Sequence, residues 1–310
     1  MLEPSENDIK REKQAELDQI ANANARCVAA YQVIRQNIFD NLETAEIEAM
    51  NKYITVEYGK VYTGLKQIII DGLNEAKVKN AEMVAKLLDL PLRKPKLYKT
   101  LPNTPAYKYT NAVFTRKSVS ARSKKAANAI TKIIADGRNN GTALVDIQKK
   151  IDIVMGFRDK RGVITPKAKK LIEMGKFTHR NGSIYETYRI ANTELARMNA
   201  IAKFEQFRDT VKSYKNCRLR LKAEFDRLPN GKYRARPQSR AMNGFISDEK
   251  GRFIYPDGRY YHLGAAPARW SINDREVSYI VFLNDEEIKN QYKTQAEQRL
   301  KSTAAYGQKA

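Results

Sequence analysis

The sequence predicts an α+β protein with long N-terminal helices, central helices and a small antiparallel β unit near the C-terminus. Over residues 5–73, apolar residues recur at steps of three, four, seven or eight, which is the period of an amphipathic helix. After residue 216 the period changes to two, as in a half-buried strand. Turn pairs such as Asn230-Gly231 and Asn243-Gly244 then separate short segments, as in antiparallel sheets.

Residues 1–90 are expected to form a pair or trio of long helices. The first apolar series comprises Ile9, Leu17, Ile20, Ala21, Val28, Tyr31, Ile34, Ile38 and Leu42. A capping signal at Thr44 precedes the second series, which comprises Ile54, Tyr58, Val61, Leu65, Ile69 and Leu73. Residues 75–90 add a further helical stretch. Cys27 follows the first series, so we interpret it as a buried, small apolar residue.

Residues 91–125 form a basic, proline-rich segment. It holds 4 prolines, 10 Lys or Arg and no acidic residue. Prolines interrupt helices and favour extended backbone. Tyr98, Tyr107, Tyr109 and Phe114 are interleaved with the basic residues. Two interpretations stay open: a solvated linker, or an arm that lies on a phosphate backbone or an acidic partner.

Residues 126–283 are expected to form an α+β domain, followed by a C-terminal helix and tail over 284–310. Gly137 is expected to end a first helix and Thr142 to cap a second. A short helix at 166–174 and a long one at 184–211 follow. Strands are predicted at 217–225, 232–236, 252–255, 259–262 and 277–283, and the last helix at 284–303.

The charge distribution favours polyanionic partners. The net charge is +22, but residues 1–50 hold 5 Lys or Arg and 10 Asp or Glu, whereas the other 260 residues hold 52 and 25. Nucleic acid is the first candidate partner and an anionic membrane surface the second. An acidic head on a basic body indicates either two different partners or a head that shields part of the body.

Few features favour catalysis or a metal site. The two cysteines, Cys27 and Cys217, are far apart, and a reduced pair in a cytoplasmic protein is the expectation. No secretory signal or membrane span is visible. No phosphate-binding glycine loop or hydrolase motif occurs. Glu224 and Asp226 resemble a nuclease pair but lack a supporting Lys or third acid, so we predict no enzyme, cofactor or metal.

The run RIANTELARMNA, residues 189–200, places several polar residues on a predicted helix. Three interpretations are a catalytic group, a nucleic-acid surface and a structural clasp. Glu186, the nearest carboxylate at a suitable helical spacing from Glu194, lies eight residues back, ~12 Å along the axis, too far to share a proton. We therefore interpret Arg189 and Glu194, flanking Thr193, as a clasp that ties the helix to the β unit.

The order of these features resembles the phage Mu F-like family of minor head, or head-morphogenesis, proteins. IIADGRNNGTALVDIQKKI is similar to the family's helical element with a glycine turn, and IANTELARMNA to its helix with an Arg-Thr-Glu core, with Asn192 at the Arg position. RPQSRAMNG (Arg236, Ser239, Asn243 and Gly244) is similar to its third element, with Arg240 in place of His. INDREVSYIVF is similar to its last, with Asp274 and Glu276 in place of the cysteines around Arg275.

These departures remove the His and Cys residues of any metal or disulfide clip in the family. Ion pairs between Arg240 and Asp274 or Glu276 are the hypothetical substitute. The resemblance covers roughly residues 113–283 and leaves residues 1–112 outside it.

The resemblance implies a phage minor head protein, associated with the portal on the capsid interior, that acts in head assembly or DNA packaging. It allows several copies around the portal, exit with the genome, and a location in the host cytoplasm during assembly, with no membrane partner. The acidic N-terminal helices are the candidate contact with portal or scaffold. The alternatives are an enzyme or toxin-like effector on a phage-derived module, or a plain cytoplasmic nucleic-acid-binding protein.

Composition independently favours non-specific binding of packaged double-stranded DNA through Lys and Arg on phosphate. The predicted DNA-binding residues are Arg93, Lys94, Lys96, Lys99, Arg116, Lys117, Arg122, Lys124, Lys125, Arg218, Arg220, Lys222, Arg234 and Arg236.

Overall fold

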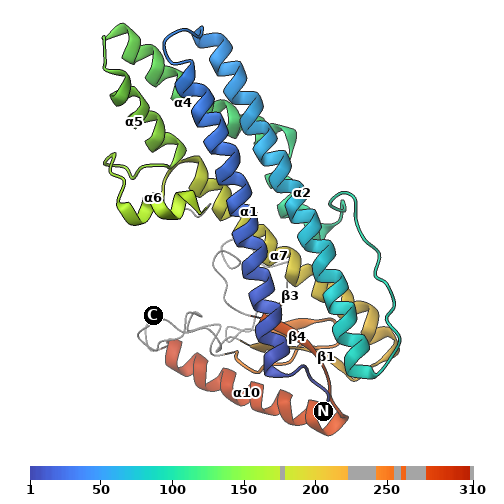
Figure 1. Ribbon diagram of the computed structural model, residues 1–310. Helices are drawn as coiled ribbons and strands as arrows, with labels where there is room; N and C mark the ends of the chain where they lie inside the picture. Colours follow the sequence, from blue (N-terminus) through green and yellow to red (C-terminus); the bar gives the residue numbers. More distant parts are fainter. Residues whose placement is uncertain (175–178, 223–241, 255–259, 263–276, 308–310) are drawn as a thin grey trace. The chain divides into compact units, whose positions relative to one another are not determined.

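The computed structural model confirms the α+β class and describes residues 1–174, 179–222, 242–254, 260–262 and 277–307 (Figure 1). For residues 260–262, 277 and 301–307 it describes the backbone alone. The helices are α1 (Glu6–Asp40), α2 (Ile47–Leu88), the 3-10 helix η1 (Pro105–Tyr107), α3 (Lys108–Val113), α4 (Arg116–Asn139), α5 (Leu144–Met155), α6 (Pro166–Glu173), α7 (Gly182–Ser213) and α10 (Asp285–Gly307). The strands are β1 (Cys217–Lys222), β2 (Arg252–Ile254), β3 (Tyr260–His262) and β4 (Val277–Phe282).

The chain forms two compact units, each built from separated stretches of sequence. The first comprises Met1–Glu16, Asp71–Thr100 and Leu195–Ala310, and the second comprises Leu17–Ile70 and Leu101–Glu194. These units do not follow the four consecutive segments expected from the sequence, because α1, α2 and α7 each contribute one part to each unit.

The N-terminal region is a pair of helices, since residues 75–90 continue α2 instead of starting a third helix. In the second unit Tyr31 of α1 packs against Tyr58 of α2, with ring centroids 5.0 Å apart. The second apolar series is buried throughout, and so is Cys27. The first series is buried except at Leu17 and Ala21, which are exposed. At these two positions the helical period alone predicted burial wrongly.

The basic, proline-rich segment is extended only in its first part. Residues 90–104 contain no helix, but η1 begins at Pro105, and α3 and α4 follow. Proline is accepted in the first turn of a helix, where its missing N–H has no partner to lose. Thr115 then caps α4 by accepting a hydrogen bond from the Ser118 N–H. The expectation of an extended, non-helical segment over 91–125 is therefore wrong beyond residue 104.

Gly137 and Thr142 do not have their predicted roles. α4 continues through Gly137 to Asn139, and the left-handed conformation falls on Gly141, with φ of +60°. The residue before α5 is Ala143, which makes no side-chain cap. A Cβ at Gly137 would lie 2.5 Å from Ile147 Cδ1. Gly137 is therefore needed for the close packing of α4 against α5.

β1 and β4 form a two-stranded antiparallel sheet in the first unit, in which Arg218 pairs with Val281 and Arg220 with Tyr279. β2 and β3 form a second pair. Along its other edge, β1 bonds to residues 244–247, where the Leu221 N–H donates to the Phe245 carbonyl. The predicted turn at 230–231 and strand at 232–236 lie outside the described residues.

The β1–β4 sheet is buried on both faces. Cys217, Leu219 and Leu221 face one apolar cluster that also contains Val84 of α2 and Phe207 of α7. On the opposite face, the cluster comprises Ile9, Ile246, Tyr279, Val281, Leu283 and Ile288. The alternating side chains of β4 are thus apolar in both directions, as in a strand covered on both sides.

Within the described part of the chain, no helix combines the length and apolar character needed to cross a membrane.

The contact at Gly137 predicts opposite effects for two Gly→Ala changes in helices. Gly137→Ala should lower the free energy of unfolding by about 1–3 kcal/mol, because Ile147 is fully buried and must move. The control Gly64→Ala lies in α2 with no atom near its new Cβ, and should raise stability by up to about 1 kcal/mol. Urea unfolding of both variants measures this; equal effects at the two sites would contradict the packing role.

Candidate nucleic-acid interface

The extended segment at residues 90–100 presents four of the predicted DNA-binding side chains. α2 ends at Leu88, and Asp89 follows with a positive φ of 51°. Pro91 and Pro95 then keep the chain from resuming a helix. Arg93, Lys94, Lys96 and Lys99 are all exposed. We call residues 90–100 the arm.

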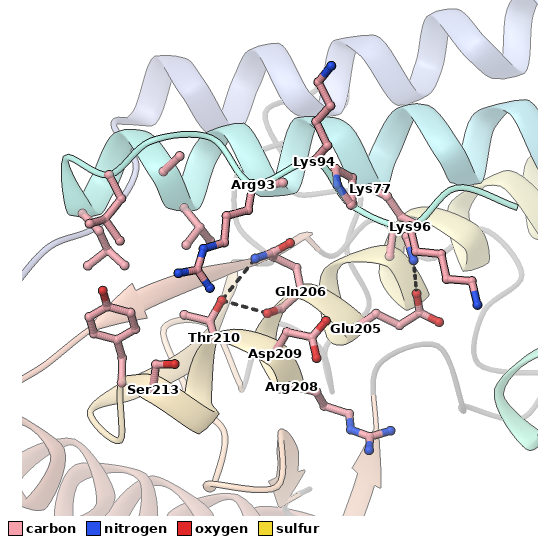
Figure 2. A pocket seen from close by; sticks show the side chains of 18 of the residues that line it. Lys77, Arg93, Lys94, Lys96, Glu205, Gln206, Arg208, Asp209, Thr210 and Ser213 are labelled. Atoms are coloured by element: carbon pink, nitrogen blue, oxygen red, sulfur yellow. Dashed lines mark hydrogen bonds and ion pairs between the residues drawn. The ribbon is translucent and has the colours of Figure 1, made fainter.

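The arm borders a groove of about 710 Å³ within the first unit, together with the last turns of α2 and the C-terminal part of α7 (Figure 2). We call this cavity the arm groove. Arg93 extends from the arm toward Gln206 and Thr210 of α7, whereas Lys94 points away from α7 (Figure 2). The side chains that face each other across the groove thus come from segments more than a hundred residues apart in the sequence.

Tyr98 anchors the arm on α2 and α7. The Asn74 side chain accepts from the Tyr98 N–H and donates to the Tyr98 carbonyl, both at 2.8 Å. The Lys77 ammonium lies 4.3 Å from the centroid of the Tyr98 ring and 2.6 Å from a Glu205 carboxylate oxygen. The two hydrogen bonds from the Asn74 side chain leave the backbone little freedom at residue 98. The arm is therefore held at this end as a defined structure.

The arm groove carries an excess of positive charge. Among the described residues, five cations and two acids line it: Lys77, Arg93, Lys94, Lys96 and Arg208 against Glu205 and Asp209. Both carboxylates have basic partners, since Glu205 pairs with Lys77 and Asp209 lies 2.8 Å from Lys212. A groove of this kind attracts anions, and phosphates above all where the cations are exposed.

The N-terminal half of α4, in the second unit, presents the next four predicted residues on its surface. Arg116, Lys117, Lys124 and Lys125 are exposed. Arg122 differs: its guanidinium lies 3.2 Å from Glu186, donates to the Val113 carbonyl at 2.8 Å and lies over the Tyr62 ring. Arg122 therefore stabilises the packing of the second unit, and we correct its assignment as a free DNA contact.

The three cations of β1 are not an open DNA-binding face. Arg218 and Arg220 are largely buried, with side chains 5% and 11% exposed, and Lys222 is half-buried. Arg220 lies 2.6 Å from Glu3, and Lys222 lies 3.6 Å from Glu6. The N-terminal segment and α10 cover this face, so the assignment of Arg220 and Lys222 as open DNA contacts is corrected, and Arg218 lines a cavity beside α10 instead of an open surface. Arg234 and Arg236 lie outside the described residues.

The acidic N-terminal segment therefore shields part of the basic body, one of the two interpretations of the charge distribution. Its Leu2 exchanges two backbone hydrogen bonds, both at 2.9 Å, with Phe282 at the edge of β4 that lies away from β1. The neighbouring Lys222 lowers the pKa of the Glu6 carboxyl, which keeps this carboxylate charged. Glu12 pairs with the buried ammonium of Lys203, which also donates to the Ser278 carbonyl.

Within RIANTELARMNA, Glu194 makes a contact between helices, whereas Arg189 contacts a residue of its own helix. Glu194 is buried and accepts a hydrogen bond from the Thr110 hydroxyl at 2.5 Å. This hydrogen bond joins α7 to α3, and the predicted tie to the β unit is not tested by the described residues. Arg189 is exposed and lies over the Tyr185 ring one turn earlier, so it ties the helix to no other element through this contact. Thr193 is half-buried.

The remaining motif residues are described only in part. Gly244 has a φ of +84°, as the predicted Asn243-Gly244 turn requires, and its N–H donates to the Leu221 carbonyl. Ser239 and Arg275 lie outside the described residues, as do Arg240, Asp274 and Glu276. The proposed ion pairs that would replace a metal or disulfide clip are therefore untested.

The described residues contain no group of three or more His, Cys, Asp or Glu side chains arranged to hold a metal. Both cysteines are free and buried. Burial raises the pKa of the Cys27 thiol to about 11 and that of Cys217 to about 12, which keeps both protonated and weakly nucleophilic. The Glu224–Asp226 pair lies outside the described residues.

Sequence reasoning missed the residues that hold the arm: Asn74, Lys77 and Glu205. A helical Asn or an isolated Lys and Glu carries no sequence signal for a partner far along the chain. Tyr98 was noted only as an aromatic among bases. Thr110, the partner of Glu194, was missed for the same reason.

No protein-family model, curated protein or solved structure matches this chain. The resemblance to the Mu F-like family therefore stays a hypothesis from the sequence.

The Asn74–Tyr98 bonds predict a local effect on the arm. Asn74→Leu removes both hydrogen bonds and should release the arm, so that trypsin cleaves after Arg93, Lys96 or Lys99 several times faster. The matched control Asn37→Leu, at an exposed position of α1, should leave this rate unchanged. Timed digestion followed by mass spectrometry measures the cleavage sites and rates. An unchanged rate in Asn74→Leu would show that the Asn74–Tyr98 hydrogen bonds do not anchor the arm.

Proposed function

We propose that this protein binds double-stranded DNA without base specificity, through the arm and the N-terminal half of α4. The observation that carries the proposal is the run of 10 Lys or Arg without one acid over residues 91–125. Eight of the nine cations predicted there as DNA contacts are exposed. Exposed cations on a scaffold that is held in place neutralise phosphates and release counterions, whatever the base sequence.

We further propose that the DNA is packaged phage DNA and that the protein is a minor head component acting at the portal in head assembly or DNA packaging. This role rests on the resemblance to the Mu F-like family, and the charge of the exposed surfaces is consistent with it. The acidic character of residues 1–50 adds one refinement. Several of its acids are occupied by the protein's own cations, such as Glu3 with Arg220, so less of this charge is available to a portal or scaffold partner.

The salt dependence of DNA affinity tests the binding proposal. The double variant Lys94→Gln/Lys96→Gln should bind a random-sequence duplex more weakly. The slope of log affinity against log salt should fall by about 0.9 for each phosphate that the variant no longer neutralises. Lys117→Gln/Lys124→Gln should act likewise, because these lysines are exposed on α4. Fluorescence anisotropy over a salt series measures both.

The control Lys60→Gln/Lys149→Gln removes the same charge at exposed lysines that already pair with Glu57 and Asp146. It should keep the parental slope. Equal reductions in affinity for the control and the arm variant would show that the effect comes from net charge alone. An affinity that does not change with salt would exclude phosphate binding.

The composition of phage particles tests the minor head role. Quantitative mass spectrometry of purified virions and of immature heads should find this chain at a low, fixed ratio to the portal protein. Its absence from both would rule out the role while leaving the DNA-binding proposal intact.

A further inference from the structure

A second cavity, of about 440 Å³, lies in the first unit between β1, the chain from Ile246 to Ile254 and α10. Its lining includes Arg218, Lys250, Arg252 and Arg299. None of these four contributes to the arm groove. We call this cavity the arginine pocket.

Arg218 places a rigid guanidinium in the wall of the arginine pocket. Its Nη1 donates to the carbonyls of Lys215 and Cys217, both at 2.7 Å. Its Nε lies 3.3 Å from the hydroxyl of Tyr292, which itself donates to the Ser247 carbonyl. These hydrogen bonds fix the plane of the guanidinium group. Nη2 is the nitrogen with the longest hydrogen-bond contact, 3.4 Å to Glu249.

The charge of Arg218 is weakly compensated for a buried group. The nearest carboxylate contact of Nη2 is Glu249 at 3.4 Å, and the Glu249 side chain is 77% exposed. A guanidinium stays protonated when buried, and burying it without a close counter-ion is costly. An exposed glutamate that spends part of its time in water supplies only part of that stabilisation.

Gln295 supplies a second donor in the lining that lacks an acceptor. Gln295 is 7% exposed, and its amide nitrogen is buried with no hydrogen-bond partner among the described residues. A buried donor without an acceptor lowers stability by about 1–3 kcal/mol. A ligand oxygen in the pocket would satisfy this donor.

The pocket also has an excess of cations. Asp248 is already engaged, since it accepts from the N–H groups of Lys250 and Arg252 and lies 2.7 Å from the Arg252 Nε. The described lining holds four cations, Arg218, Lys250, Arg252 and Arg299, and two acids, of which Glu249 is the one that contacts Arg218. The pocket therefore favours a compact anion with several acceptor oxygens.

We propose that the arginine pocket binds a phosphate group, which accepts hydrogen bonds from Arg218 Nη2 and Gln295 Nε2. Arginine suits this ligand because its planar fork matches tetrahedral oxyanions. Glu249 occupies the edge of Arg218 when no ligand is bound and competes with the anion. The inference is independent of the arm and α4, and the phosphate belongs either to a free phosphate or nucleotide, or to a nucleic-acid backbone.

Calorimetric titration of the full chain with inorganic phosphate in chloride buffer tests the site. The parent protein should bind phosphate. Gln295→Leu should weaken binding about fivefold, the effect of one hydrogen bond, whereas Gln298→Leu, at an exposed position of the same helix, should not. Glu249→Gln should strengthen binding about threefold, because it removes the competing carboxylate. If Arg218 had only a structural role, Glu249→Gln would not raise the affinity of the protein for phosphate.

A short duplex oligonucleotide as the second probe distinguishes the sources of the phosphate. If the pocket takes a backbone phosphate, Gln295→Leu should weaken duplex binding and inorganic phosphate should compete. If the pocket takes a free phosphate, Gln295→Leu and Glu249→Gln should keep the duplex affinity of the parent protein, while their affinity for inorganic phosphate changes. No phosphate binding by either the parent or Glu249→Gln, with duplex affinity unchanged by both variants, would overturn the proposal.

Discussion

The pairing of β1 with β4, covered by apolar side chains on both faces, is the constraint on which the first unit depends. It joins residues some sixty positions apart in the chain. Because β4 presents apolar residues in both directions, the unit needs a cover on each face. α2 and α7 contribute to one cover, and the start of α1 with α10 contributes to the other. The basic side chains of β1 lie under this second cover.

This burial explains the acidic N-terminal segment. A lysine or arginine under an apolar cover requires a counter-charge, since removing a charge from water is costly. Glu3 and Glu12 supply this charge to Arg220 and Lys203. The acidity of the head is thus in part an internal requirement of the fold. What remains open to a polyanion is the arm, α4 and a pocket where Arg218 has only a weak counter-charge.

The two surfaces with exposed cations are built differently. The prolines keep the arm extended, and hydrogen bonds from the Asn74 side chain hold it at Tyr98. Its lysines therefore project from a backbone that makes few hydrogen bonds within the arm itself. The cations of α4 stand on a capped helix whose buried face packs against α5. Both arrangements suit the recognition of phosphate charge, which needs position but no base-reading geometry.

The sequence by itself determined the α+β class, the helical period of α1 and α2, the alternation of β1 and the turn at Gly244, because each depends on local backbone geometry and residue spacing. It also determined the overall excess of positive charge. Only the tertiary structure decided that Arg218 and Arg220 are buried, that Gly137 packs against α5, and that Glu194 meets Thr110. Partners of this kind lie far apart along the chain, and the energy of a buried charge depends on which segment covers it, which no local pattern records.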